Sequence, residues 1–202
     1  MSENPKDAIP TRRLVHERKI DLKAFRRDDD LWDIEAELLD TKPQDFQLAA
    51  VHRKKNEPIH QMQLKITINE QMDIIQASAK SYQVPYPGFC EKIAPDYSQL
   101  VGLNLLKNFR EGVKSRLGGY LGCTHLSELT KLLPTVATQG FAGEIFPVQT
   151  APENNGGNEP ELPFHFNGCH ALRTDGEAVK TYHPIWYGYP LQVGKFIFGK
   201  NK

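Results

Sequence analysis

A strict alternation of apolar and charged side chains constrains the fold more than any other feature of this chain. Every second position is apolar from Trp32 to Leu38, and the positions between are acidic. The same pattern recurs from Leu64 to Asn69, where Lys65 and Thr67 separate apolar residues. Because successive side chains of a strand point to opposite faces, this period of two predicts strands with one buried face.

Each of these strands is expected to form a hairpin. The segment 13–42 reads as two strands joined by a turn at residues 28–30, three consecutive aspartates, since aspartate bonds its own backbone in turns. A second turn near residues 69–71 returns the chain along residues 72–79. Two hairpins predict an antiparallel sheet.

Apolar residues spaced four apart predict helices after the sheet. One stripe predicts a helix over about 97–117, ending at Gly118-Gly119. A second helix is expected over about 124–140, kinked or interrupted at Pro134. The predicted fold class is therefore α+β: an antiparallel sheet from two β-hairpins packed against two helices, with an irregular C-terminal arm. The apolar residues of the first stripe are Val101, Leu105, Phe109, Val113 and Leu117.

Composition divides the chain into three parts. Residues 1–11 are polar and are expected to be disordered. Residues 12–143 form the predicted α+β core domain. Residues 144–202 are interpreted as a turn-rich linker followed by an aromatic-rich C-terminal arm docked on the core, since aromatic side chains such as Trp186 commonly anchor a tail.

Charge and hydropathy exclude some classes of partner. Lys and Arg number 25, as do Asp and Glu, so the chain lacks the basic excess of a nucleic-acid-binding protein, and no nucleic acid partner is expected. No apolar run reaches the roughly 20 residues of a membrane span. The polar start of the chain does not resemble a secretory signal. Three cysteines cannot all pair, so reduced thiols and a cytoplasmic location are predicted. A protein partner stays open.

The three cysteines carry the leading functional hypothesis. Cys123 lies where the second predicted helix begins, where partial positive charge favours a thiolate, and His125 is two residues away. Cys90 and Cys169 also lie beside proline or glycine, outside the predicted helices and strands. Zinc binds four Cys or His ligands in structural sites, and iron–sulfur clusters bind thiolates. We therefore predict a metal or iron–sulfur site formed by Cys90, Cys123, Cys169 and His125, with His165 and His170 as other possible fourth ligands.

Two other interpretations stay open. Cys123 suits a thiol-dependent enzyme in which it is the nucleophile, stabilised by the helix terminus and a histidine. Alternatively, the cysteines are buried and inert in a non-catalytic interaction module, since free cysteine is among the most buried residue types. No nucleotide-binding, zinc-protease or serine-hydrolase motif occurs, so whether the chain is an enzyme is undecided.

Several segments resemble a bacterial family known as domain of unknown function 2889. The resemblance runs from about Arg12 to Tyr187 and includes RRDDDLWDIEAELLDTKP, VPYPGFC, GGYLGCTHLSEL and GCHALRTDGEAVKTYHP. It implies that the three cysteines and His125 are recurring features, and it implies no activity.

The order of hairpin, cysteine loop, helix and cysteine-headed helix is also similar to iron–sulfur cluster scaffold (NifU-like) proteins. In those scaffolds three cysteines with an acidic or histidine partner hold zinc or a cluster. The similarity implies that Cys90 and Cys123 match the second and third scaffold cysteines. No cysteine precedes the second hairpin, where His60 stands, so Cys169 would replace the missing ligand.

Overall fold

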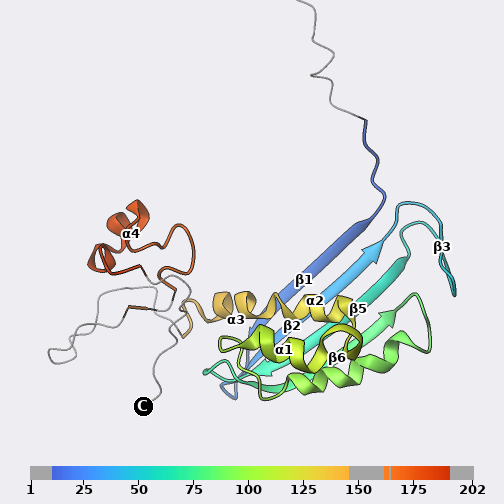
Figure 1. Ribbon diagram of the computed structural model, residues 1–202, viewed down its shortest axis with the longest axis horizontal. Helices are drawn as coiled ribbons and strands as arrows, with labels where there is room; N and C mark the ends of the chain where they lie inside the picture. The colour runs from blue at the N-terminus through green and yellow to red at the C-terminus, as the bar shows by residue number, and fades with distance from the viewer. Residues whose placement is uncertain (1–10, 146–161, 164, 192–202) are drawn as a thin grey trace, which may run out of the picture.

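A four-stranded antiparallel sheet is the centre of the structure, a computed structural model that describes residues 11–145, 162–163 and 165–191. Figure 1 shows the sheet with helices on one face. The strand order is β1-β2-β5-β6, and two short strands form a separate small sheet that the sequence did not predict. This arrangement confirms the predicted α+β class. The strands are β1 (Glu17–Arg26), β2 (Trp32–Thr41), β3 (Phe46–Gln47), β4 (His52–Arg53), β5 (Pro58–Ile68) and β6 (Ile74–Gln83).

Both predicted hairpins form. β1 pairs with β2 around the aspartate turn, where Asp30 takes a positive φ of 59° that aspartate tolerates better than most residues. β5 pairs with β6, and Met72 has a φ of 66° in that second turn. β2 and β5 pair in the middle of the sheet, so the two strands with the clearest alternation are its central strands.

One face of the sheet is buried by helices. The alternating apolar residues of β2 and β5 all lie on this face, from Trp32 at one end to Met62 near the other. Helix α2 (Thr124–Thr130) lies over β5 and β2, and helix α3 (Leu133–Phe141) lies over β1 and β2. The opposite face carries the charged residues of the same strands, which explains the period of two.

The first predicted helix is not continuous. Over 97–117 the structure has the end of a 3₁₀ helix η2 (Cys90–Leu100), a connection of turns and isolated bridges, and helix α1 (Phe109–Leu117). The connection pairs with the sheet: Gly102 N donates to the Ile74 carbonyl (2.9 Å), and Ile74 N donates to the Leu103 carbonyl (2.8 Å). These bonds satisfy backbone groups that a helix would have satisfied internally, so the helical stripe is interrupted.

The second predicted helix is interrupted where proline suggested. α2 ends at Thr130, and Pro134 lies in the first turn of α3, where its missing N–H costs no helical hydrogen bond. Gly140 of α3 lies against the sheet, because an added Cβ would come within 2.8 Å of the Ala24 Cβ.

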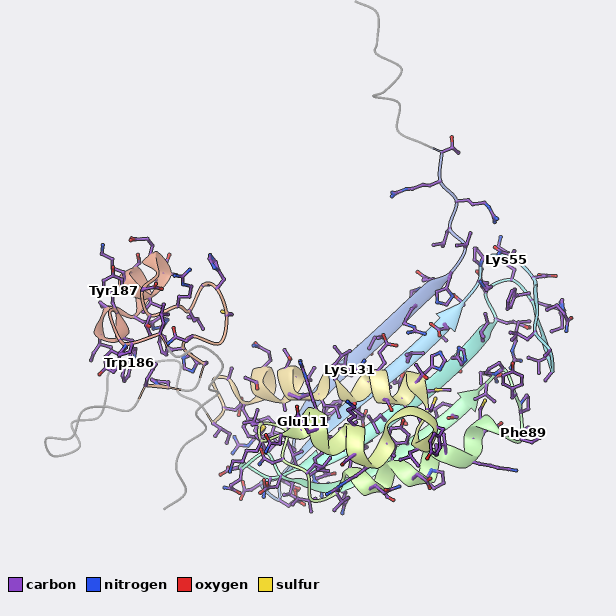
Figure 2. The ribbon with its side chains drawn as sticks, viewed as in Figure 1. Lys55, Phe89, Glu111, Lys131, Trp186 and Tyr187 are labelled. Atoms are coloured by element: carbon purple, nitrogen blue, oxygen red, sulfur yellow. The ribbon has the colours of Figure 1, made fainter. Side chains whose placement is uncertain are left out.

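The C-terminal residues form a small unit with its own buried cluster. It contains helix α4 (Glu177–Tyr182) and a 3₁₀ turn η4 (Pro184–Trp186). Phe166, Val179 and Trp186 are buried against one another, whereas Tyr187 is 42% exposed; Figure 2 labels the last two. The aromatic residues of the predicted arm therefore include a local core, and its docking on residues 12–143 stays a prediction.

Parts of the predicted domain organisation lie outside the described residues. They are the disordered start, of which residues 1–10 are not described, most of the linker (146–161) and the end of the arm (192–202). Among the described helices, none combines the length and the apolar character that crossing a membrane requires.

Candidate functional site

Asp40 is a buried carboxylate on the inner face of the sheet. It continues the inward phase of β2 after Leu38, and its side chain is only 2% exposed. His60 of β5 is its direct cross-strand partner, and His60 Nδ1 lies 3.1 Å from Asp40 Oδ2. The two polar side chains therefore meet where an otherwise apolar face ends.

His125 joins this pair from helix α2, which covers the same end of β5. The His125 and His60 rings stack with centroids 3.8 Å apart, and His125 Nε2 lies 3.8 Å from Asp40 Oδ2. Asp40, His60 and His125 each offer one ligand atom, and these atoms all lie within 4.8 Å of one another. Within residues 11–145, 162–163 and 165–191, no other group of three Cys, His, Asp or Glu meets this condition.

Arg18 of β1 neutralises the carboxylate. Its Nε and Nη2 donate to the two Asp40 oxygens at 2.7 and 2.8 Å, a bidentate pair. Arg18 Nη1 also reaches Glu128 of α2, and His16 Nε2 lies 3.3 Å from Asp40 Oδ1. Arg18 thus has two acidic partners, and one of them lies outside the Asp40–His60–His125 cluster.

Burial and charge set the ionisation of this cluster. Burial opposes ionisation of Asp40, but the hydrogen bonds and charge of Arg18 outweigh it and lower the Asp40 pKa. Burial lowers the pKa of His60, and the neighbouring His125 lowers it further. Burial, followed by the charge of Arg18, lowers the pKa of His125. The cluster therefore combines a carboxylate with two imidazoles that favour the neutral state.

Cys123 lies at the edge of this cluster. It is the residue before α2, and its Sγ lies 3.9 Å from His125 Nδ1. Tyr97, fully buried, fixes its backbone: the hydroxyl accepts from Cys123 N–H (3.0 Å) and donates to the Cys123 carbonyl (2.9 Å). Gly122 is required beside it, because a Cβ there would lie 2.2 Å from the Leu117 carbonyl oxygen. The close approach to Leu117 accounts for the glycine of the GCTHL motif, and the Tyr97 bonds fix the backbone of its cysteine.

The other two predicted ligands lie in different surroundings. Cys90 begins η2 and is partly buried against the main core. Cys169 is exposed and belongs to the C-terminal segment. All three cysteines are free thiols. The structure therefore brings together Cys123 and His125 of the predicted set, and no cysteine belongs to a three-ligand group within the described residues. The three-cysteine site stays a prediction.

The arrangement fits the chemistry of a divalent transition metal. Neutral imidazoles and an ionised carboxylate are the forms that bind such ions. Two histidines and one carboxylate form catalytic zinc sites and also the triad of non-haem iron proteins. Sequence reasoning missed Asp40 and His60, although both were visible as polar residues in the inward phase of their strands.

The fold and the site define an α+β protein with a candidate two-histidine, one-carboxylate centre at the end of an antiparallel sheet. The chain belongs to the family described as "Protein of unknown function (DUF2889)", whose model matches residues 16–139. This match confirms the family resemblance over residues 16–139 and includes the whole candidate centre. The resemblance of the segment from residue 140 to Tyr187 and the bacterial origin stay predictions. No curated protein and no solved structure matches the chain. The similarity to iron–sulfur scaffolds stays a prediction.

Proposed function

We propose that this protein binds a divalent transition metal through Asp40, His60 and His125, with zinc as the first ion to test. The observation that carries the proposal is the convergence of the three ligand atoms within 4.8 Å, from three different elements of the fold. Burial supports it, because the exposed fractions of the His60 and His125 side chains are only 14% and 24%. Partial burial excludes competing water while leaving a route to solvent.

Arg18 is the structural feature that competes with the metal. Its guanidinium occupies both oxygens of Asp40, and a second cation beside that carboxylate is unfavourable. Glu128 offers Arg18 an alternative partner, so metal binding requires Arg18 to give up one or both Asp40 bonds and keep Glu128. The proposal therefore predicts that removal of Arg18 strengthens metal binding.

Zinc titration with matched variants tests the site. His60→Gln and His125→Gln each remove one ligand and are expected to weaken zinc binding at least about a hundredfold, since changing residues that only support metal ligands already costs roughly 10–100-fold. Arg18→Gln is expected to strengthen binding about tenfold, equivalent to about 1.4 kcal/mol. His52→Gln, at an exposed histidine of the small sheet, is the control and should change nothing. Unchanged binding in both ligand variants would refute the proposal.

The same titration separates this site from the three-cysteine set. A Cys90→Ser, Cys123→Ser, Cys169→Ser triple variant should retain zinc if the Asp40 centre is correct. Loss of zinc or of an iron–sulfur cluster in that variant, with retention in His60→Gln, would favour the cysteine set instead. Cobalt spectra of Cys123→Ser alone report whether this one thiolate is a fourth ligand.

A thiol enzyme is the second candidate, and one observation favours it. Cys123 Sγ faces Nδ1 of His125, while Nε2 of the same ring faces Asp40 at 3.8 Å. This order of thiol, imidazole and carboxylate lets His125 accept the Sγ proton while Asp40 stabilises the resulting imidazolium. His125→Gln should then slow alkylation of Cys123 at neutral pH about tenfold, with Cys90 in the same molecule as the control. Equal rates of Cys123 alkylation in the unmodified protein and in His125→Gln would exclude this role for His125.

A further inference from the structure

Three ligands leave the fourth position of a tetrahedral metal centre unassigned. Structural zinc sites fill this position with a fourth side chain, whereas catalytic zinc sites leave it to water or substrate. Two side chains that can bind zinc lie beside the three ligands. His16 Nε2 is 3.3 Å from Asp40 Oδ1, and Cys123 Sγ is 3.9 Å from His125 Nδ1. Which of the two reaches the metal decides whether the site is closed by an imidazole or by a thiolate.

Cys123 faces the wrong nitrogen of the His125 ring. Its Sγ faces Nδ1, whereas Nε2 is the nitrogen that lies 3.8 Å from Asp40 Oδ2. The two nitrogens of an imidazole are distinct ligand positions that point in different directions. A metal bound between Asp40 and Nε2 therefore lies on the other side of the ring from the thiol.

His16 lies on the same face of the sheet as the three ligands. Arg18 is the cross-strand partner of Asp40, and Asp40 is the partner of His60, so these side chains form one row across β1, β2 and β5. His16 precedes Arg18 by two positions, and residues two apart along an extended chain point to the same side. The 3.3 Å separation from Asp40 Oδ1 agrees with this placement.

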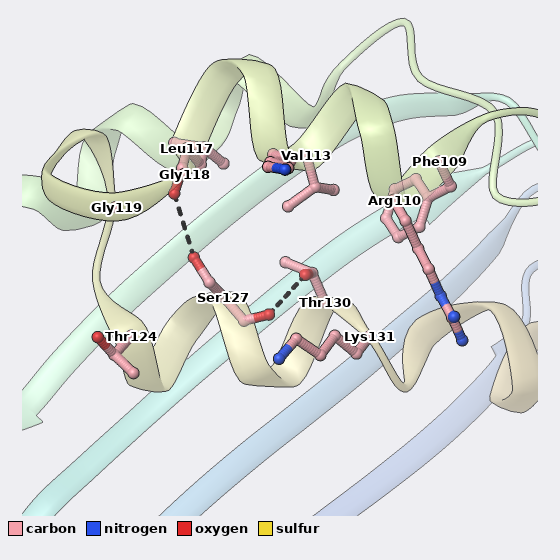
Figure 3. Close-up of a pocket in the computed structure, with 11 residues that line it drawn as sticks. Phe109, Arg110, Val113, Leu117, Gly118, Gly119, Thr124, Ser127, Thr130 and Lys131 are labelled. Atoms are coloured by element: carbon pink, nitrogen blue, oxygen red, sulfur yellow. Dashed lines mark hydrogen bonds between the residues drawn. The ribbon is translucent and has the colours of Figure 1, made fainter.

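His16 is also the side chain with the most freedom to move. The other ligands belong to central strands and to α2, which Figure 3 shows held to α1 by the bond from Ser127 Oγ to the Leu117 carbonyl (3.4 Å). His16 instead ends a segment, residues 11–16, without regular secondary structure, and its side chain is 41% exposed. Zinc–ligand distances of roughly 2.0–2.2 Å bring ligand atoms to within about 3.6 Å of one another. The cluster must contract around an ion, and His16 can follow.

Arg18 and His16 contact the same oxygen of Asp40. Arg18 Nε lies 2.7 Å from Oδ1, and His16 Nε2 lies 3.3 Å from it. An ion beside Asp40 repels the guanidinium, for which Glu128 is the alternative partner. Withdrawal of Arg18 then leaves His16 beside Oδ1 without this competing donor.

We propose that His16 is the fourth ligand and closes the centre as a tetrahedral site of three histidines and one carboxylate. The inference rests on the metal binding by Asp40, His60 and His125 proposed above. Three nitrogens and one oxygen suit zinc, whereas the two-histidine, one-carboxylate triad of iron proteins keeps open positions. Bound metal then ties the start of β1 to β2, β5 and α2.

Cobalt titration with imidazole rescue tests the fourth ligand. Co²⁺ is the probe, because its visible bands respond to the number and type of its ligands. His16→Gly should weaken cobalt binding about tenfold, less than His60→Gln does, because water can take the fourth position. Free imidazole should restore the original spectrum in this variant and leave the unmodified protein unchanged. His52→Gly, at an exposed histidine of the small sheet, is the matched control and should bind cobalt as the unmodified protein does.

The other outcomes separate this inference from the proposed function. Equal affinity and an identical spectrum in His16→Gly would overturn the role of His16 and leave the three-ligand centre intact. Imidazole binding to the unmodified protein as tightly as to His16→Gly would also overturn it, since the fourth position would then be open. A thiolate band that disappears in Cys123→Ser would assign the position to that cysteine. Absence of cobalt binding by the unmodified protein would overturn the proposed function and this inference together.

Discussion

The two tryptophans of the chain lie in cores of very different size. Trp32 belongs to residues 11–145, and Trp186 belongs to residues 162–191. Trp32 belongs to a cluster that joins four strands to the covering helices. Among the described residues, Trp186 is buried with Phe166 and Val179, and the partly buried Leu162, Leu172 and Tyr189 pack against them. Apolar burial grows with chain length, and units of about 40 residues or fewer seldom hold together on a core alone. A buried tryptophan therefore belongs to a large cooperative core in one region and to a core of marginal stability in the other.

Of the changes that test the difference between the two cores, removal of the Trp186 side chain has the largest expected effect on stability. Trp→Ala in a core costs roughly 3–5 kcal/mol, which is about the whole net stability that a core this small supplies. Trp186→Ala should therefore unfold residues 162–191 and leave the sheet intact. Hydrogen exchange by mass spectrometry checks it: fast exchange in the C-terminal peptides with unchanged β2 and β5 peptides is expected. Loss of protection in the sheet as well would show that the two regions fold together.

Ile66→Ala is the converse change in the sheet. Ile66 is fully buried in β5, so the truncation should cost roughly 2–5 kcal/mol of core stability. Urea unfolding followed by Trp32 fluorescence measures this loss of stability. A Trp186→Phe background removes the fluorescence of the second tryptophan. Trp186→Phe is a mild background, since the indole N–H has no hydrogen-bond partner within the described residues. Lys80→Ala, on the exposed surface, should shift the midpoint little.

Arg18→Leu has a smaller expected effect on the core. Asp40 would remain buried with only histidine partners, and a buried acceptor left partly unsatisfied costs roughly 1–3 kcal/mol. The double variant with Asp40→Leu should recover much of this loss, because no buried charge then remains. Urea unfolding of the two variants checks it. If the single and double variants are equally unstable, the loss comes from packing of the arginine chain and not from the carboxylate.

The smallest predicted effect is an acid sensitivity of the C-terminal unit. Burial, followed by the charge of His183, lowers the pKa of His165, so the folded unit prefers the neutral ring. Its stabilising contribution is complete above the unfolded pKa of about 6.5 and decreases as pH falls below it, because the unfolded state then binds more protons. The free energy of unfolding of this unit should therefore decrease from pH 7 to pH 5. It is measured in urea from Trp186 fluorescence in a Trp32→Phe background. His165→Gln should flatten this dependence, and a slope that persists would assign it to another group.

The sheet was predictable because its signal is local. The alternation from Trp32 to Leu38 depends only on the geometry of a strand, and the aspartate turn and Pro134 act through their own backbone preferences. The break between η2 and α1 was not predictable in this way. Its cause is the pairing of Gly102 and Leu103 with Ile74, which satisfies backbone groups across a long separation in sequence.

In the candidate metal centre, too, some features follow from local sequence and others only from contacts between distant residues. The sequence identified His125 and its neighbour Cys123 from their position at the start of a helix. Asp40 was not singled out, and His60 was named only as the residue that stands where a scaffold cysteine is missing, since a single polar residue at the end of an apolar phase is common at the surface. Only the register of β2 against β5, with α2 laid over them, makes the carboxylate buried and the imidazoles its neighbours.

The sequence by itself thus determined the fold class, the two hairpins and the place where the second helix is interrupted. Each follows from the preferences of residues close together in the chain. The tertiary structure alone decided which polar side chains converge and that Trp186 has a core of its own. These outcomes depend on contacts between residues far apart in sequence, whose distances no local pattern encodes.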